Sequence, residues 1–532
     1  MIPLTLAELA DATGGRLNEQ AAAQARVTGP VVTGPVVADS RLVRPGALFV
    51  ALPGERVDGH DYAAAAVAAG AVAVLAGREV GVPAVIVDDP LLALGRLARA
   101  VLDRLPAVTV IGVTGSSGKT STKDLLAALL ADAGPTVAPL GSFNNELGLP
   151  LTALGCDAAT RYLVAEMGAR EPGNISYLCT ITPPRIAVVL NVGAAHAGIF
   201  GSREVTARAK GELAAALPPD GVAVLNADDA AVRGLPAPAG VRVVLFGRAT
   251  DAQVRADDVR LDEQARAAFT LVAGGERAGV TLRLHGEHHV SNALAAAAVG
   301  LQVGLGVQRV AKLLSSAAPA SRWRMDVHTS PGAVVVVNDA YNANPDSMRA
   351  ALRALAVMGR GGADQPGRTE PGRTEPGRTE PRRTEPRRTW AVLGEMLELG
   401  DDSPGEHEAI GRALVDLDIS RLVAVGEGAA RVIHRGAVQN RSDRSDRSDG
   451  TRAAWVPDQE AAFAMLQAEL RPGDIVLVKA SRSVGLDALA TRLLSEPARP
   501  DGVPVPVRLP PAGEDGARIG GPAAEPDGEG MA

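Results

Sequence analysis

One segment constrains the fold of this chain more than any other: VTVIGVTGSSGKTSTKDLLAALLADAG, over residues 108–134. Its first residues are β-branched and apolar, as in a buried strand, and its last part has leucines at helical spacing before Gly134. Between them lies a turn of small residues, Gly115–Gly118, followed directly by Lys119 and Thr120. Loop amides and the N-terminus of the next helix face an anion in such an arrangement. The segment therefore predicts a phosphate-binding loop in an α/β domain.

Each part of this loop has an expected role. Lys119 is placed to reach the outer phosphates of a nucleotide, and the Thr120 hydroxyl is placed to ligate Mg²⁺. Val113 stands where the first glycine of G-x-x-x-x-G-K-[ST] belongs, so the match is incomplete. The alternative is a plain glycine turn with a surface lysine, but the flanking strand and helix are the context that the motif requires. The residues expected to bind the nucleotide here are Gly115, Ser116, Ser117, Gly118, Lys119, Thr120 and Ser121.

Composition limits the classes of function. Aromatic residues make up only 2% and the net charge is −7, which argues against nucleic-acid partners and favours small molecules. Cys156 and Cys179 are the only cysteines, which fits a reducing cytosol and excludes a cysteine-built zinc site. No apolar run reaches the ~18–20 residues of a membrane span, and the N-terminus lacks the basic flank of a signal peptide. We therefore expect a cytoplasmic protein with no membrane contact. We also expect it to be a monomer.

The 532 residues are enough for about three domains of roughly 100–200 residues. Short apolar strands alternate with alanine-rich helices, which predicts an α/β fold with mostly parallel sheets. We expect a small α/β N-terminal domain (1–106), a central phosphate-loop ATPase-like domain with a mostly parallel sheet (107–320), and a Rossmann-like C-terminal domain (321–496). Arg-Thr-Glu-Pro and Arg-Ser-Asp repeats predict disordered insertions at 362–389 and 440–450, and 497–532 reads as a disordered tail.

Three residues downstream of the loop are candidates for the same site. Glu166 ends the apolar run Leu163–Ala165, and a carboxylate at a strand end beside a nucleotide is placed to bind Mg²⁺. His196 follows another strand, at the edge where open parallel sheets bind ligands. Lys210 lies in the amphipathic helix REVTARAKGELAAAL. Taken singly, the three also fit a solvated glutamate, a structural histidine and a surface lysine.

Together these segments resemble a known family. The runs TGSSGKT, EMG, NVGAAHAGIFGS and ARAKGE are similar to the central domain of the Mur ligases, ATP-dependent amide-forming enzymes of peptidoglycan precursor synthesis that share the shortened T-G-x-x-G-K-T loop. The resemblance implies ATP and two Mg²⁺ sites. It implies that Glu166, with Thr120, holds the first Mg²⁺, and that His196 and Lys210 belong to the second, with Lys210 as a carbamate. The expected catalytic residues are therefore Lys119, Glu166, His196 and Lys210.

Two further segments suggest where the first substrate binds. Asp39-Ser40-Arg41 and the following RPGALFVALPGERVDGHDY resemble the uridine-nucleotide-binding domain of some Mur ligases, which implies substrate contacts for Ser40 and Arg41. A helix cap beside a surface arginine is an equally good interpretation of that pair. Asn144 and Asn145 are candidates for binding the peptide or sugar, although Asn-Asn is also ordinary turn chemistry.

The run NDAYNANPDSM, residues 338–348, discriminates best among Mur ligases, because it resembles the members that add D-alanyl-D-alanine. The resemblance implies a ligase that joins D-alanyl-D-alanine to UDP-N-acetylmuramoyl-tripeptide through an acyl phosphate. It places Asn292, Arg324 and Asp339 near the nucleotide, and it assigns substrate contacts to Tyr341, Asn342, Asn344, Lys479, Ser481 and Arg482. A folylpolyglutamate-type ligase and a nucleotide-binding regulator without catalysis are the alternatives. Neither explains both the N-terminal unit and the four retained catalytic candidates.

Overall fold

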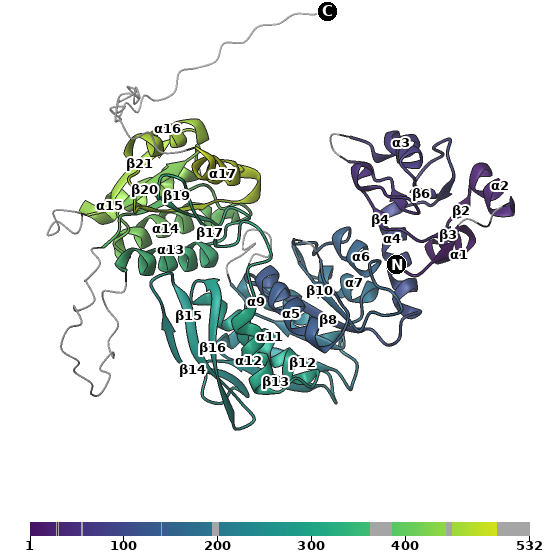
Figure 1. Ribbon diagram of the computed structural model, residues 1–532, viewed down its shortest axis with the longest axis horizontal. Helices are drawn as coiled ribbons and strands as arrows, with labels where there is room; N and C mark the ends of the chain where they lie inside the picture. Colours follow the sequence, from purple (N-terminus) through teal and green to yellow (C-terminus); the bar gives the residue numbers. More distant parts are fainter. Residues whose placement is uncertain are drawn as a thin grey trace, which may run out of the picture.

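The structure is a computed structural model that describes residues 1–27, 29, 31–54, 57–139, 141–193, 202–361, 386–442 and 450–496. Its strands form three main sheets that follow one another along the sequence, and each is covered by helices (Figure 1). This confirms the expected α/β fold with a small N-terminal domain, a central domain and a C-terminal domain. Among the residues described, no helix is long and apolar enough to cross a membrane.

The N-terminal domain contains a five-stranded sheet in the order β2-β7-β6-β5-β4 and a small pair, β1-β3. The strands β4 to β7 are parallel to their neighbours, and β2 joins the edge antiparallel. Its elements are β1 (Leu4–Thr5), α1 (Leu6–Thr13), β2 (Arg16–Leu17), α2 (Glu19–Val27), β3 (Val31–Val32), β4 (Val36–Val37), η1 (Ser40–Leu42), β5 (Leu48–Val50), η2 (Gly59–Tyr62), α3 (Ala63–Ala68), β6 (Ala73–Ala76), β7 (Ala84–Ile86) and α4 (Pro90–Asp103).

The central domain is built on a nine-stranded sheet in the order β16-β15-β14-β13-β12-β11-β8-β10-β9. The phosphate loop follows β8, which is paired in parallel with β10 and β11. The domain comprises β8 (Thr109–Thr114), α5 (Lys119–Ala133), β9 (Thr136–Val137), α6 (Gly148–Ala153), β10 (Tyr162–Glu166), α7 (Asn174–Ile181), β11 (Ile186–Val189), α9 (Arg203–Ala215), β12 (Val222–Asn226), α10 (Ala230–Arg233), β13 (Arg242–Gly247), β14 (Val254–Leu261), β15 (Arg266–Ala273), β16 (Glu276–His285), α11 (His288–Gln302) and α12 (Val307–Ser316).

The C-terminal domain has a six-stranded sheet in the order β17-β18-β22-β19-β20-β21, parallel except for β17. Its elements are β17 (Asp326–Thr329), β18 (Val335–Asn338), α13 (Pro345–Arg360), β19 (Thr389–Leu393), η3 (Gly400–Asp402), α14 (Ser403–Asp416), β20 (Arg421–Val425), α15 (Ala429–Ser442), β21 (Arg452–Val456), α16 (Gln459–Glu469), β22 (Ile475–Lys479), η4 (Arg482–Val484) and α17 (Asp487–Ser495).

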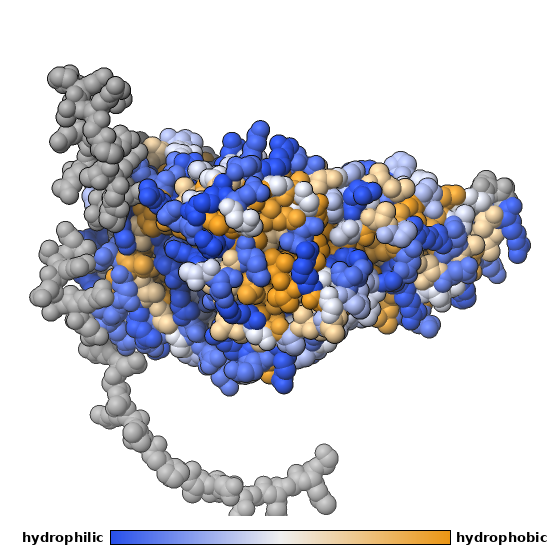
Figure 2. Space-filling model, turned by 90° about the horizontal axis from the view of Figure 1, so that it is seen from below, coloured by the Kyte–Doolittle hydropathy of each residue, from blue (hydrophilic) through white to orange (hydrophobic). Residues whose placement is uncertain are grey.

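Apolar packing joins the first two domains. One hydrophobic cluster runs from the N-terminal domain through α4 to one face of the central sheet. A Cβ atom on Gly95 of α4 would lie 3.0 Å from the Ile181 side chain of α7, so these helices pack at close range. The other face of the central sheet packs against α5, α11 and α12. On the face of the molecule in Figure 2, hydrophobic side chains gather near the middle and hydrophilic ones cover most of the rest.

The structure differs from the predicted organisation in two places. The three strands β14, β15 and β16 form an antiparallel extension of the central sheet. The alternation of strands and helices in the sequence did not predict this extension. The predicted insertions are also shorter than expected, because Thr389 begins β19 and α15 continues to Ser442. The remainder of both insertions, 362–385 and 443–449, and the tail 497–532 lie outside the described residues.

A candidate nucleotide and ligation site

The phosphate loop closes the carboxyl end of β8. Gly118 has φ +81°, in the left-handed region that favours glycine. A Cβ atom there would also lie 2.4 Å from the Asn292 side-chain oxygen. The loop is held from β11 as well, because the Ser117 backbone N–H donates to the Asn191 side chain at 2.9 Å. Backbone conformation and close packing therefore both require the small residues of this loop, and they bring Asn292 against it as expected.

The Lys119 side chain folds back onto the phosphate loop. Its ammonium donates to the Gly115 carbonyl at 2.6 Å. Burial lowers the pKa of Lys119, the negative charge of Glu166 opposes that shift, and the positive charge of Arg324 adds to it. The site thus holds a partly desolvated cation, and partial desolvation strengthens its attraction for phosphate.

Glu166 ends β10 and is fully buried. One of its oxygens, Oε1, accepts from the Ser142 hydroxyl at 3.1 Å and from the Asn144 amide at 2.9 Å. The other, Oε2, is buried and has no hydrogen-bond partner among the described residues. A buried carboxylate oxygen without a donor is costly unless a cation or a proton satisfies it. Glu166 therefore fits a cation site, and Asn144 orients it. Asn145 has a different role, because its side chain accepts from the Gly148 N–H at the start of α6.

Lys210 is 2% exposed, so the interpretation of this residue as a solvated helical lysine is wrong. It lies on α9, and burial lowers its pKa to about 7, with a further contribution from the positive charge of Lys119. Burial therefore favours the uncharged form of this amine. His196 lies within 194–201, outside the described residues. Among the described residues, no group of three or more His, Cys, Asp or Glu side chains is arranged to hold a metal.

The C-terminal domain supplies the other wall of the phosphate site. Arg324 donates to the Thr120 hydroxyl at 2.9 Å, and its guanidinium lies 4.1 Å from the centre of the Tyr341 ring. The Asn344 amide reaches the Ser116 carbonyl at 3.4 Å. The predicted residues Arg324 and Asn344 thus contact the loop across a domain boundary, and Tyr341 packs against Arg324.

Behind this wall lies a buried ion pair. Lys479 is 2% exposed and donates to the Asp339 carboxylate at 2.6 Å and to the Asn342 carbonyl at 2.8 Å. Burial lowers the pKa of Lys479, and the charge of Asp339 opposes the shift. The other Asp339 oxygen accepts from the Met325 N–H at 3.0 Å. Lys479 therefore supports Asp339 and the chain around Asn342.

The remaining predicted substrate residues fall into two groups, with Ser481 and Arg482 near Tyr341 and with Ser40 and Arg41 in the N-terminal domain. Ser481 is buried and accepts from the Leu397 N–H at 2.9 Å, while the Arg482 guanidinium lies 4.2 Å from the centre of the Trp323 ring. Ser40 and Arg41 lie in η1 of the N-terminal domain, on the far side of the central domain from the C-terminal domain (Figure 1). Arg41 is 88% exposed at its side chain and is paired with Asp39 at 2.7 Å. The structure does not bring these two residues to the phosphate loop.

Two histidines that the sequence did not single out lie at the start of α11. Burial lowers the pKa of His288 to about 4 and that of His289 well below its usual value. The Asn292 amide contacts His289 Nδ1 at 3.3 Å. The pattern GEHH at the start of the helix that carries Asn292 could have drawn attention to both.

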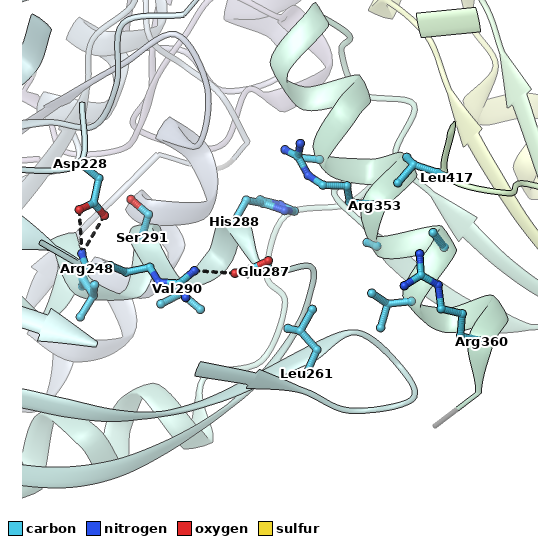
Figure 3. A pocket seen from close by; sticks show the side chains of 15 residues that line it. Asp228, Arg248, Leu261, Glu287, His288, Val290, Ser291, Arg353, Arg360 and Leu417 are labelled. Atoms are coloured by element: carbon cyan, nitrogen blue, oxygen red, sulfur yellow. Dashed lines mark hydrogen bonds and ion pairs between the residues drawn. The ribbon is translucent and has the colours of Figure 1, made fainter. Parts of the chain in front are cut away.

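A cavity of about 470 Å³ lies between α11 and α13. Figure 3 shows His288 extending from α11 toward α13, where Arg353 and Arg360 line the opposite wall. Arg248 and Glu287 form an ion pair at 2.6 Å on the central-domain side. Arginine side chains of both domains therefore line the cavity. Its lining residue His288 lies one helical turn before Asn292 in α11.

The chain matches three family models in succession. They are described as Mur ligase family, catalytic domain (residues 35–102), Mur ligase middle domain (113–300), and Mur ligase, glutamate ligase domain (379–482). A curated relative from Mycobacterium tuberculosis is 50% identical over 528 residues, which cover 93% of this chain and 98% of that protein. This chain belongs to the Mur ligase family.

Other relatives of this Mur ligase agree with that assignment. The M. tuberculosis protein and one from Escherichia coli, 33% identical over 93% of this chain and 99% of that protein, are both named UDP-N-acetylmuramoyl-tripeptide--D-alanyl-D-alanine ligase. A crystal structure of MurF from Acinetobacter baumannii has a TM-score of 0.74 at 30% identity, over 92% of this chain and 99% of that one. The MurF ligase of Thermotoga maritima in complex with ADP has a TM-score of 0.69 at 31% identity, over 86% and 97% of the two chains.

Proposed function

We propose that this Mur ligase joins D-alanyl-D-alanine to UDP-N-acetylmuramoyl-tripeptide with ATP as the energy source, in peptidoglycan synthesis. The observation that carries the proposal is similarity along nearly the whole chain to ligases of that name, at 50% identity to the M. tuberculosis protein. The phosphate loop and the C-terminal residues against it support ATP as the nucleotide, as does the ADP complex of the T. maritima relative.

The reaction has two steps that balance. A tripeptide carboxylate attacks the γ-phosphorus of ATP, the bond to the β–γ bridging oxygen breaks, and ADP leaves an acyl phosphate behind. The amine of D-alanyl-D-alanine then attacks the acyl carbon, and the carbon–oxygen bond to phosphate breaks with release of inorganic phosphate and a proton. In this proposal Lys119, the loop amides and Arg324 stabilise charge on the transferred phosphoryl group. Positioning of the carboxylate and the amine supplies much of the remaining rate.

The residues present fit the cations that this reaction uses. Glu166, at the end of β10, offers a buried oxygen without a donor, and the Thr120 hydroxyl lies in the first turn of α5, directly after the phosphate loop. We propose that these two hold one Mg²⁺, and that His196 with Lys210 as a carbamate belongs to a second site. Burial of Lys210 supports the carbamate, because only an uncharged amine reacts with carbon dioxide. Bound Mg²⁺ would offset the repulsion between the carboxylate and the triphosphate.

The substrates then occupy different domains. Asn292 lies against Gly118, and His288 lines the cavity one turn nearer the N-terminus of α11, so we place the nucleotide base along that helix. We place the uridine nucleotide in the N-terminal domain near Ser40 and Arg41, and the dipeptide near Tyr341 in the C-terminal domain.

We also propose that the protein is cytoplasmic, because ATP and the uridine-nucleotide precursors are found in the cytoplasm. We propose that it acts as a monomer. The domain limits 1–106, 107–320 and 321–496 are proposed as well, since no helix or strand of the described residues crosses them.

The decisive test is product formation by the purified chain. With ATP, Mg²⁺, UDP-N-acetylmuramoyl-tripeptide and D-alanyl-D-alanine, mass spectrometry should show a product equal to the tripeptide precursor plus the dipeptide minus one water. Phosphate release should require all components. Replacement of the dipeptide by L-alanyl-L-alanine is the matched control and should lower the rate strongly. Phosphate release that needs neither peptide substrate would contradict the proposal.

A further inference from the structure

The first two turns of α5 hold the segment that links the central and C-terminal domains. The Ser321 backbone N–H donates to the Asp124 carboxylate at 3.1 Å, and Arg324 donates to the Thr120 hydroxyl at 2.9 Å. Thr120 and Asp124 are four residues apart, so they lie on the same face of the helix. The linker therefore runs along the helix that begins at the phosphate loop.

The linker has an unusual backbone on either side of Arg324. Trp323 has φ 61° and Met325 has φ 50°, both in the left-handed region that large side chains rarely adopt. Such conformations persist only where surrounding contacts hold them. Here the Trp323 carbonyl accepts from the Tyr341 N–H at 3.3 Å, and the Met325 N–H donates to Asp339. The linker thus forms hydrogen bonds to the C-terminal domain on either side of Arg324, while Arg324 itself bonds to the central domain.

Lys123 connects the linker to a second segment. It is 3% exposed and forms an ion pair with Asp124. Its ammonium also donates to the Pro139 carbonyl at 3.0 Å and contacts the Ser321 hydroxyl at 3.4 Å. A buried ammonium is expensive unless such partners replace its water. The partners of Lys123 come from α5, from the segment after β9, and from the linker.

The segment after β9 leads to Glu166. Three residues beyond Pro139, the Ser142 hydroxyl donates to Glu166 Oε1 at 3.1 Å, and the Asn144 amide donates to the same oxygen at 2.9 Å. The linker contacts of Asp124 and Lys123 are therefore connected to the groups that orient Glu166 through the chain between Pro139 and Ser142.

We propose that Lys123 and Asp124 are positioning residues that couple the interdomain linker to the loop that orients Glu166. When the C-terminal domain brings Arg324 to Thr120, the same contacts hold Ser142 and Asn144 on the Glu166 carboxylate. The same set of contacts would then position both the ATP-binding groups and the cation-binding carboxylate. Spatial proximity alone is not evidence of coupling, which has to be measured as an energy between sites. The catalytic part of this inference rests on the proposed function; the part that concerns the linker does not.

A double-mutant cycle tests the catalytic part. Lys123→Met and Ser142→Ala are made singly and together, and kcat is measured with saturating substrates. Because misplacement by about 1 Å can cost on the order of 100-fold, we expect Lys123→Met to lower kcat by about 10- to 100-fold, with a change of less than about twofold in the KM for the tripeptide precursor. The double variant should be about as active as the slower single one. Multiplicative effects, as for independent sites, would overturn the coupling.

Asp132→Asn is the matched control, because Asp132 also lies on α5 and pairs with Arg309, away from the linker. It should leave kcat unchanged. If Lys123→Met fails to fold, as judged by thermal unfolding, Asp124→Asn takes its place in the cycle, since it keeps the shape and removes the ion pair.

Trp323 provides a measurement that does not need ligase activity. Addition of ADP and Mg²⁺ should change the tryptophan fluorescence of the parent, and Trp323→Phe should remove that change. Lys123→Met and Asp124→Asn should reduce its amplitude severalfold, whereas Asp132→Asn should not. An unchanged amplitude in both variants would overturn the role of the pair at the linker. A parent that shows the fluorescence change but forms no product would instead refute the proposed function alone.

Discussion

Arg324 of the C-terminal side donates a hydrogen bond to Thr120 of the phosphate loop at 2.9 Å. Its guanidinium is held over the Tyr341 ring, and its Nε atom is buried without a partner among the described residues. An unsatisfied cationic donor directed at a phosphate loop is a ready partner for an anion. This contact therefore joins the domain interface to the chemistry.

Replacement of Arg324 should affect catalysis more than folding. We expect Arg324→Met to lower kcat by on the order of 100-fold, as for removal of a preorganised donor to developing charge. The thermal unfolding midpoint should change little. Arg322→Met is the control, because Arg322 is an exposed neighbour, and its activity should equal that of the parent. Equal losses in the two variants would assign the effect to the linker as a whole, against a specific role for Arg324.

Glu166→Gln should separate cation binding from stability. The change keeps the shape and removes a buried negative charge whose Oε2 has no donor. Without added metal we expect the variant to unfold at the same temperature as the parent or a higher one, because a buried carboxylate oxygen without a donor destabilises a fold. Ligase activity should fall at least ~100-fold. Mg²⁺ with ADP should raise the unfolding midpoint of the parent more than that of the variant. An equal rise in both would show that Glu166 does not hold the cation.

Glu212 of α9 should stabilise the fold by capping α7. Its carboxylate accepts from the backbone N–H groups of Gly173 at 2.6 Å and Ser176 at 2.9 Å, at the N-terminus of α7. We expect Glu212→Gln to lower the free energy of unfolding by about 1 kcal/mol, because it removes a charged helix cap. Arg208→Gln, an exposed change on the same helix, is the control. Urea unfolding measures both, and a loss in the control as large as in Glu212→Gln would refute the capping role.

Stability should fall as the pH drops below about 6.5. Burial lowers the pKa of His288 to about 4 and also lowers that of His407, whose Nε2 accepts from the Met396 N–H at 2.8 Å. In this pH range the two imidazoles therefore bind protons in the unfolded chain and stay neutral in the folded chain. Between pH 6.5 and 4, His288 alone should cost roughly 1.4 kcal/mol per pH unit. Thermal unfolding across this range measures the slope, which His288→Asn should reduce. An unchanged slope in that variant would contradict the lowered pKa.

The phosphate loop shows what the sequence by itself determined. A β-branched strand, a run of small residues and a helix that starts at Lys119 are local features, fixed by neighbours within about ten residues, and the structure has all three where the pattern placed them. Glu166 at the end of β10 is local in the same sense. Sequence alone also identified the family, because its motifs are short and contiguous.

Only the tertiary structure decided what surrounds those residues. The burial of Lys210 depends on how α9 packs, and the pairing of Lys479 with Asp339 joins residues 140 positions apart. The same is true of Lys123, which depends on Pro139 and Ser321. The reason is physical: helical periodicity reports which face of an element is apolar, whereas a buried ammonium is stabilised by oxygens from distant segments. The chain's pattern placed the phosphate loop, and long-range packing decided which of its charges lie buried beside it.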